Sequence, residues 1–96
     1  MTPAAERVPL IRERLTEAFD PEQLDIVDDS HKHAGHASAR GGGHFTVTIV
    51  ADAFTGKSPI ERHRMVHDAL EDKMADGTIH ALSIRASAPE AGNQTQ

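Results

Sequence analysis

Apolar residues recur along this chain with two different periods, and these periods predict five elements of secondary structure. Near the N-terminus the spacing is helical, with side chains of one face at Val8, Ile11, Leu15, Ala18 and Phe19. We expect this helix from about Pro9 onward, because a proline lacks an N–H and disturbs the turn that precedes it. It should end at Asp20-Pro21, since the residue before a proline avoids the α region.

Two strands follow, each marked by alternation of apolar and polar residues. The first covers Gln23 to Asp28, and the second covers His44 to Ala51. We expect the two strands to pair antiparallel. Residues 28–43 between them form a polar connection rich in glycine and histidine, which should project from one end of the sheet. A connection of that length in a small domain is usually functional or disordered.

A second helix is predicted after a turn at residues 52–57. Ser58 and Glu61 have the spacing of a capping box, and Pro59 takes the favoured first helical position. The helix should run to about Ala75. Its predicted apolar stripe runs along the whole helix. The stripe consists of four apolar residues, Ile60, Val66, Leu70 and Met74, and also includes His63 and His67.

The last predicted strand covers residues 79 to about 86, with Leu82 and Ile84 on one face and His80 on the same parity. The order of elements is therefore αββαβ, a mixed α+β fold. Burying one face of a three-stranded sheet under two helices is the expected solution. We predict a single domain over residues 1–89 and a disordered tail over residues 90–96.

Composition adds candidate chemistry to this scaffold. The 96 residues include seven histidines and no cysteine. Four of the histidines are within fourteen positions, in and just after the long connection: His31, His33, His36 and His44. Neutral imidazole is a common ligand of transition metals. The chain thus offers metal ligands but no thiolate, and a partner must bring any thiolate that is needed.

Charge argues mildly against general nucleic-acid binding, because a net charge of −5 repels a polyanion. The dense basic group is Lys57, Arg62 and Arg64, at the start of the second predicted helix. It is either a site for an anion or nucleic acid or a solvated charged face. No apolar run is long enough to span a membrane, and no secretory signal or Arg-rich presequence is visible. We therefore expect a bacterial cytoplasm rather than a mitochondrial matrix.

Four spaced motifs make the chain resemble the BolA family. They are residues 28–36 (DDSHKHAGH), 54–58 (FTGKS), 62–66 (RHRMV) and 79–84 (IHALSI). The resemblance covers about residues 6 to 89. It implies an αββαβ fold similar to class II KH domains, with a short extra helical turn before the long second helix. The Gly-x-x-Gly loop with which KH domains clamp nucleic acid is absent from the sequence.

The resemblance also implies a function. BolA proteins pair with monothiol glutaredoxins of the Cys-Gly-Phe-Ser (CGFS) type, and the two proteins share a [2Fe-2S] cluster with a glutathione that the glutaredoxin binds. Matched by motif, the ligands of this chain would be His80 and His36. The chain resembles the members whose loop ligand is histidine rather than cysteine. The apo protein would be a monomer or a weak dimer that serves iron-sulfur cluster trafficking or iron regulation.

Several alternatives stay open at this point. His33 competes with His36 as the loop ligand. His63 is either an auxiliary ligand or a histidine that orients His80, whereas His67 is expected in the core or at its rim. No motif places a catalytic residue, so we predict a non-enzyme. Because some bacterial BolA proteins are described as DNA-binding transcriptional regulators, that function is the alternative.

Overall fold

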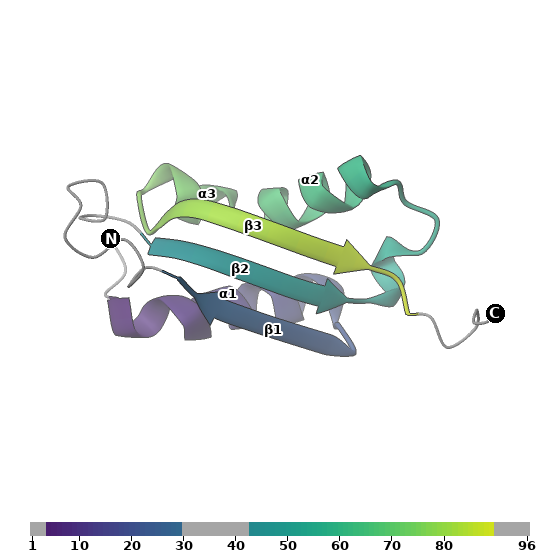
Figure 1. The fold of residues 1–96 in the computed structure, drawn as a ribbon, viewed down its shortest axis with the longest axis horizontal. Coiled ribbons are helices and arrows are strands. Elements are labelled where there is room, and N and C mark those ends of the chain that lie inside the picture. The colour runs from purple at the N-terminus through teal and green to yellow at the C-terminus, as the bar shows by residue number, and fades with distance from the viewer. Residues whose placement is uncertain (1–3, 30–42, 90–96) are drawn as a thin grey trace.

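The computed structural model describes residues 4–29 and 43–89 as a three-stranded sheet with helices packed against it (Figure 1). Residues 30–42 and the predicted tail at 90–96 lie outside the described residues. The elements follow in this order: α1 (Ala4–Phe19), β1 (Gln23–Asp28), β2 (Gly43–Val50), a 3-10 turn η3 (Asp52–Phe54), α2 (Pro59–Ala69), α3 (Glu71–Ala75) and β3 (Ile79–Ser87). The αββαβ order and the extra helical turn before α2 are confirmed.

The strands lie in the order β1-β2-β3. β1 pairs antiparallel with β2, as predicted, and β3 pairs parallel with β2. The C-terminal end of β1 and the N-terminal ends of β2 and β3 therefore meet at one end of the sheet (Figure 1). A parallel neighbour requires a crossover connection, which η3, α2 and α3 supply.

The core lies between one face of the sheet and the helices. Side chains of β2 alternate strictly between buried and half-buried positions, so one face of the central strand packs inward. The buried apolar cluster draws on α1, β2, η3, α2 and β3: Ile11, Leu15, Phe45, Val47, Ile49, Ala51, Phe54, Val66, Leu70 and Ile79. The predicted coverage of one sheet face by helices is confirmed.

The first helix begins earlier than we predicted, at Ala4, and Pro9 lies inside it. A proline here removes the bond to the carbonyl of Ala5, four residues before it. Ala5 and Pro9 are both exposed, so this part of the helix is open to solvent, and the helix continues through Pro9. The predicted end is confirmed. Asp20 adopts a left-handed φ of 47°, and its N–H donates to the carbonyl of Thr16 at 2.9 Å.

The second predicted helix is interrupted, which corrects the expectation of one continuous helix to Ala75. The break is at Leu70, whose φ of −116° and ψ of 11° leave the helical region. Its N–H donates to the carbonyl of His67 at 3.0 Å, three residues back rather than four. Leu70 is fully buried. The tertiary packing of this side chain outweighs the helical preference of the local sequence.

A paired ion bridge joins the helices across the fold. Both terminal nitrogens of Arg14 in α1 donate to the carboxylate of Asp72 in α3, at 2.7 and 2.8 Å. These hydrogen bonds from Arg14 lower the pKa of Asp72 from 3.8 to about 2. The ion pair is bidentate and its hydrogen bonds are charge-assisted. The side chain of Asp72 is nevertheless more than half exposed to solvent.

We expect Asp72→Asn to lower the free energy of unfolding at pH 7 and to have less effect in acid. The carboxylate pKa is depressed in the folded state, so its contribution is present above its ordinary pKa near 4 and disappears as the pH falls toward 2. Urea denaturation of both proteins at pH 7 and pH 2.5 measures this. The control is Asp68→Asn, an exposed carboxylate with no ion pair to a described residue. A difference between wild type and Asp72→Asn that stays constant across these pH values would contradict the prediction.

Candidate functional site

The long connection is attached beside the beginning of β3. At its N-terminal side, the N–H of Asp29 donates to the carbonyl of His44 at 2.7 Å, and the Asp29 carboxylate accepts the Thr46 hydroxyl at 2.7 Å. At its C-terminal side, the N–H of Gly43 donates to the carbonyl of Thr78 at 3.2 Å. Both anchors of the connection are therefore at the end of the sheet where His80 lies. His31, His33 and His36 themselves lie outside the described residues.

His80 is exposed because of an irregularity in the strand pairing. Gly43 pairs with Ile79, but the next residue, His44, pairs with Ala81. His80 is thus the extra residue of a β-bulge. Ile79 is buried and His80 is exposed, so Ile79 takes the inward position at the start of the strand. The prediction that His80 shares the face of Leu82 and Ile84 is wrong, because the bulge shifts the alternation by one residue.

The His80 ring lies next to the ring of His44, with centroids 5.1 Å apart and planes tilted by 49°. The Nε2 atom of His44 is buried. The imidazole of His80 makes no hydrogen bond to any residue in 4–29 or 43–89, which leaves both of its nitrogens available on that part of the surface. Sequence reasoning missed His44 as the neighbour of His80. Parallel pairing of the starts of β2 and β3 would have revealed it.

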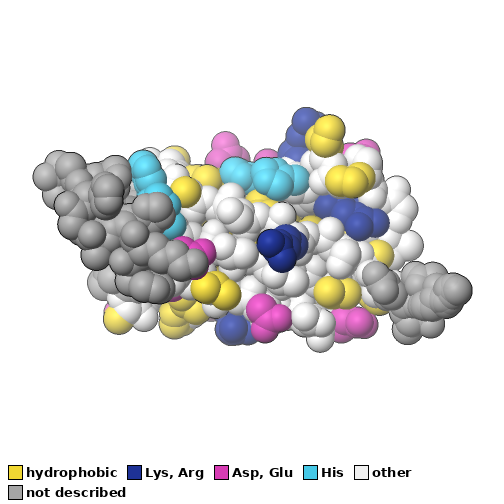
Figure 2. Space-filling model, viewed as in Figure 1, with side chains coloured by type: hydrophobic (Ala, Val, Ile, Leu, Met, Phe, Trp, Pro, Cys, Tyr) yellow, Lys and Arg dark blue, Asp and Glu magenta, His cyan; other side chains and the backbone are white. Residues whose placement is uncertain are grey.

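His63 and His67 form a second pair on α2, with ring centroids 4.8 Å apart and planes tilted by 33°. Histidine side chains accordingly gather in two separate areas of this face, one at the end of the sheet and one over α2 (Figure 2). Within residues 4–29 and 43–89, no three His, Asp or Glu side chains form a group that could hold a metal ion. An auxiliary or orienting role of His63 toward His80 stays a prediction.

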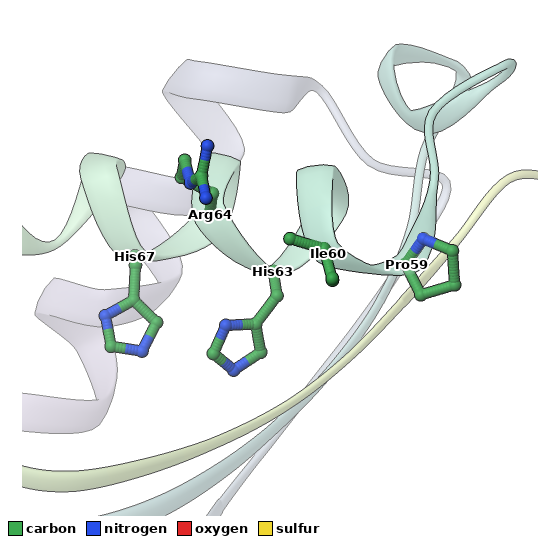
Figure 3. Close-up of a pocket in the computed structure, with 5 residues that line it drawn as sticks. All are labelled: Pro59, Ile60, His63, Arg64 and His67. Atoms are coloured by element: carbon green, nitrogen blue, oxygen red, sulfur yellow. The ribbon is translucent and has the colours of Figure 1, made fainter.

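Ile60, expected in the apolar stripe of α2, is 70% exposed. This expectation was wrong because Ile60 and Val66 are six residues apart, which places them about 120° apart around a helix. The buried side of α2 is centred on Val66 and Leu70 instead. Ile60 joins Pro59, His63, Arg64 and His67 around an open hollow of about 480 Å³ (Figure 3).

The three basic residues near the start of α2 have different surroundings. Arg62 is half-buried and donates to the carbonyl of Ala86 in β3 at 3.5 Å. Lys57 and Arg64 line a different hollow that also contains the carboxylates of Glu61 and Asp68. The positive charge is therefore divided between two places and partly neutralised in one of them.

The N-terminus of α2 already holds a carboxylate of this chain. Glu61 Oε1 accepts the N–H of Ser58 at 2.8 Å, and Ser58 Oγ accepts the N–H of Glu61 at 3.2 Å. This is the predicted capping box, and it is confirmed. The hydrogen bond from the Ser58 backbone lowers the pKa of Glu61. An external anion would have to displace this carboxylate from the helix end.

Ser58→Ala should lower the free energy of unfolding by about 1 kcal/mol, as is usual when a hydroxyl cap is lost. The side chain is exposed, so the effect comes from the unsatisfied N–H of Glu61 rather than from packing. Thermal and urea unfolding measure it. Ser58→Asp, which supplies another capping oxygen, is the control and should restore most of the stability. Equal losses in both variants would argue against a capping effect.

None of the helices in the two described segments is long and apolar enough to cross a membrane. The family model that matches the chain is that of BolA-like protein, over residues 15–91. Among curated relatives, SufE-like protein 1 of Arabidopsis thaliana, chloroplastic/mitochondrial, is 47% identical over an alignment of 85 residues, with coverage of 82% of this chain and 23% of that protein. BolA-like protein 1 of Mus musculus is 43% identical over 79 residues, covering 82% of this chain and 56% of the mouse protein.

A bacterial relative is also similar. The DNA-binding transcriptional regulator BolA of Escherichia coli (strain K12) is 39% identical over 74 residues, covering 77% of this chain and 68% of that protein. The chain thus spans about a quarter of the Arabidopsis relative and about half of the mouse relative.

Solved structures agree with the sequence matches. The BolA domain of SufE1 from Arabidopsis thaliana has a TM-score of 0.74 at 45% identity, covering 86% of this chain and 92% of that domain. The solution structure of BolA1 from Mus musculus has a TM-score of 0.69 at 40% identity, covering 93% of this chain and 68% of that one. The resemblance inferred from the four motifs is confirmed. The likeness to class II KH domains stays a prediction.

Proposed function

Because the chain belongs to the BolA-like protein family, we propose that it is a non-catalytic partner of a CGFS-type monothiol glutaredoxin. The two proteins would share a [2Fe-2S] cluster, with His80 and His36 as the ligands from this chain. The glutaredoxin would supply its cysteine and a bound glutathione. The complex would serve cluster trafficking or iron regulation, and we place it in a bacterial cytoplasm.

The observation that carries this proposal is the position of His80. Its imidazole is exposed at the end of the sheet where both anchors of the long connection lie. His36 is seven residues from Asp29 and seven from Gly43. Seven extended residues span at most about 23–25 Å, so chain length permits His36 to reach His80. His33, four residues from Asp29, is the alternative loop ligand.

The donor set of this chain fits a shared cluster better than a site of its own. Imidazole is a ligand type that suits iron, and the chain has no cysteine to supply a thiolate. The described residues hold no group of three potential ligands. Histidine ligation gives a cluster a higher reduction potential than thiolate ligation alone. His44 packs against the His80 ring and limits the directions in which that ring points. Cluster binding requires neutral imidazoles, so protonation in acid should weaken it.

The test mixes the full chain with a CGFS glutaredoxin, iron, sulfide and glutathione without oxygen. A visible circular dichroism spectrum distinct from that of the glutaredoxin homodimer is expected. A spectrum identical to that of the homodimer at every mixing ratio would contradict the proposal. Comparing His36→Ala with His33→Ala then assigns the loop ligand, because the variant that lacks the ligand should lose the new spectrum.

DNA binding is the second candidate function, and the name of the Escherichia coli relative favours it. The basic residues at the start of α2 would make the contact. We rank it second because Arg62 contacts Ala86, Glu61 occupies the helix end, and the net charge is −5. Titration of duplex DNA at two salt concentrations tests it. Binding at physiological salt that weakens in an Arg64→Gln variant would support DNA binding, and no binding would oppose it.

A further inference from the structure

The pair of histidines on α2 has a geometry suited to binding one metal ion. His63 and His67 are four residues apart, and residues at this spacing lie above one another on a helix face. Figure 3 shows both rings projecting to the same side of α2, whereas the guanidinium of Arg64 points to the opposite side. The helix thus presents two adjacent imidazoles, and the guanidinium of Arg64, which lines the same hollow, is directed away from them.

The separation of the rings agrees with joint coordination. Zinc–imidazole bonds of about 2.0–2.1 Å place a ring centroid about 3.2 Å from the ion. Two such rings at angles between about 90° and 109° would have centroids about 4.5–5.2 Å apart. The observed separation is 4.8 Å. Rotation of the rings about their terminal torsions, which are broad and soft, suffices to turn a nitrogen of each toward a common ion.

The surroundings of the two histidines have room for a metal ion and include carboxylates whose negative charge favours a cation. The two histidines line the open hollow over α2, next to the exposed side chain of Ile60. His67 also lines an adjoining hollow together with Asp68 and Glu71. Since no third described residue completes a ligand group, water or a group from another molecule would fill the remaining coordination positions.

We propose that His63 and His67 form a two-histidine site for a borderline divalent transition-metal ion of the zinc, nickel or copper class. Imidazole suits these ions. The site is separate from the one proposed for His36 and His80, which lies at the end of the sheet, and it does not depend on a glutaredoxin. Its open coordination makes it a surface chelate rather than a structural metal centre.

The test is a Zn²⁺ titration of the untagged full chain, monitored by the NMR signals of the individual imidazole rings. The rings of His63 and His67 should respond together with one midpoint. In His67→Gln, the His63 ring should need about tenfold or more Zn²⁺, because the second contact no longer adds to the first. An unchanged His63 midpoint in that variant would overturn the proposal.

Two controls separate this site from the rest of the chain. His33→Gln and His36→Gln remove competing loop histidines and should leave the shared response of His63 and His67 intact. Loss of that response in either variant would show that the ion binds elsewhere. His67→Gln should also leave the spectrum of the mixed cluster with glutaredoxin unchanged, so failure of the α2 site and failure of the proposed function give different results.

Discussion

Replacing His80 with alanine should abolish the mixed [2Fe-2S] cluster and leave the domain folded. The imidazole is exposed and makes no hydrogen bond within residues 4–29 and 43–89, so its removal creates no cavity. We expect the free energy of unfolding to change by no more than about 0.5 kcal/mol, as for an ordinary surface substitution. Visible circular dichroism of the anaerobic mixture measures the cluster, and urea denaturation measures the fold.

His80→Cys is the matched variant, because it keeps a metal ligand at the same place in the bulge. It should recover a mixed cluster with an altered spectrum and a lower reduction potential, since thiolate replaces imidazole. Formation of the wild-type cluster in His80→Ala would remove this histidine from the ligand set. Global unfolding of His80→Ala would instead show that the ring has a structural function that the described contacts do not explain.

Phe54→Ala should lower the free energy of unfolding by about 3–5 kcal/mol, the usual range for removal of a buried phenylalanine. Phe54 is fully buried in η3. Its ring lies 5.0 Å from that of Phe19 at the end of α1, with planes tilted by 41°. The substitution would remove an aromatic contact between the crossover and the first helix. Urea denaturation at pH 7 measures the loss.

The control for Phe54→Ala is Thr55→Ala, the next residue, whose side chain is exposed and whose loss should change stability by no more than about 0.5 kcal/mol. A double-mutant cycle with Phe19→Ala should show a coupling of about 0.5–1.5 kcal/mol, as tilted aromatic pairs do. Similar small effects of Phe54→Ala and Thr55→Ala would contradict the assignment of Phe54 to the core. A large loss of stability in Phe54→Ala alone would show that the first residue of the FTGKS motif is structural.

Local patterns in the sequence were sufficient for most of the fold. Alternation at Phe45, Val47 and Ile49 predicted the central strand and its inward face, because side chains of a strand point to opposite faces in turn. The hydrogen-bonding chemistry of Ser58 and Glu61 predicted the start of α2 to the residue. These signals depend only on near neighbours, so tertiary packing did not alter them.

The errors came from contacts between distant residues. The break occurs at Leu70, a residue that is fully buried in the shared core. The exposure of His80 follows from its pairing with β2, which is more than thirty positions away in the sequence. A single-strand pattern contains no information on such a bulge. The sequence therefore predicted neither the exposure of His80 nor its contact with the ring of His44, and the ligand set itself stays a prediction.

Because of the bulge, Ile79 points inward and His80 points to solvent. Simple alternation back from Leu82 would give the reverse. A regular ladder would turn the imidazole toward the hydrophobic interior. Transplanting this ligand into another protein would therefore require moving the beginnings of β2 and β3 as one unit. Deleting Ile79 would remove the bulge, bring His80 opposite Gly43 and turn its ring inward without altering its chemistry.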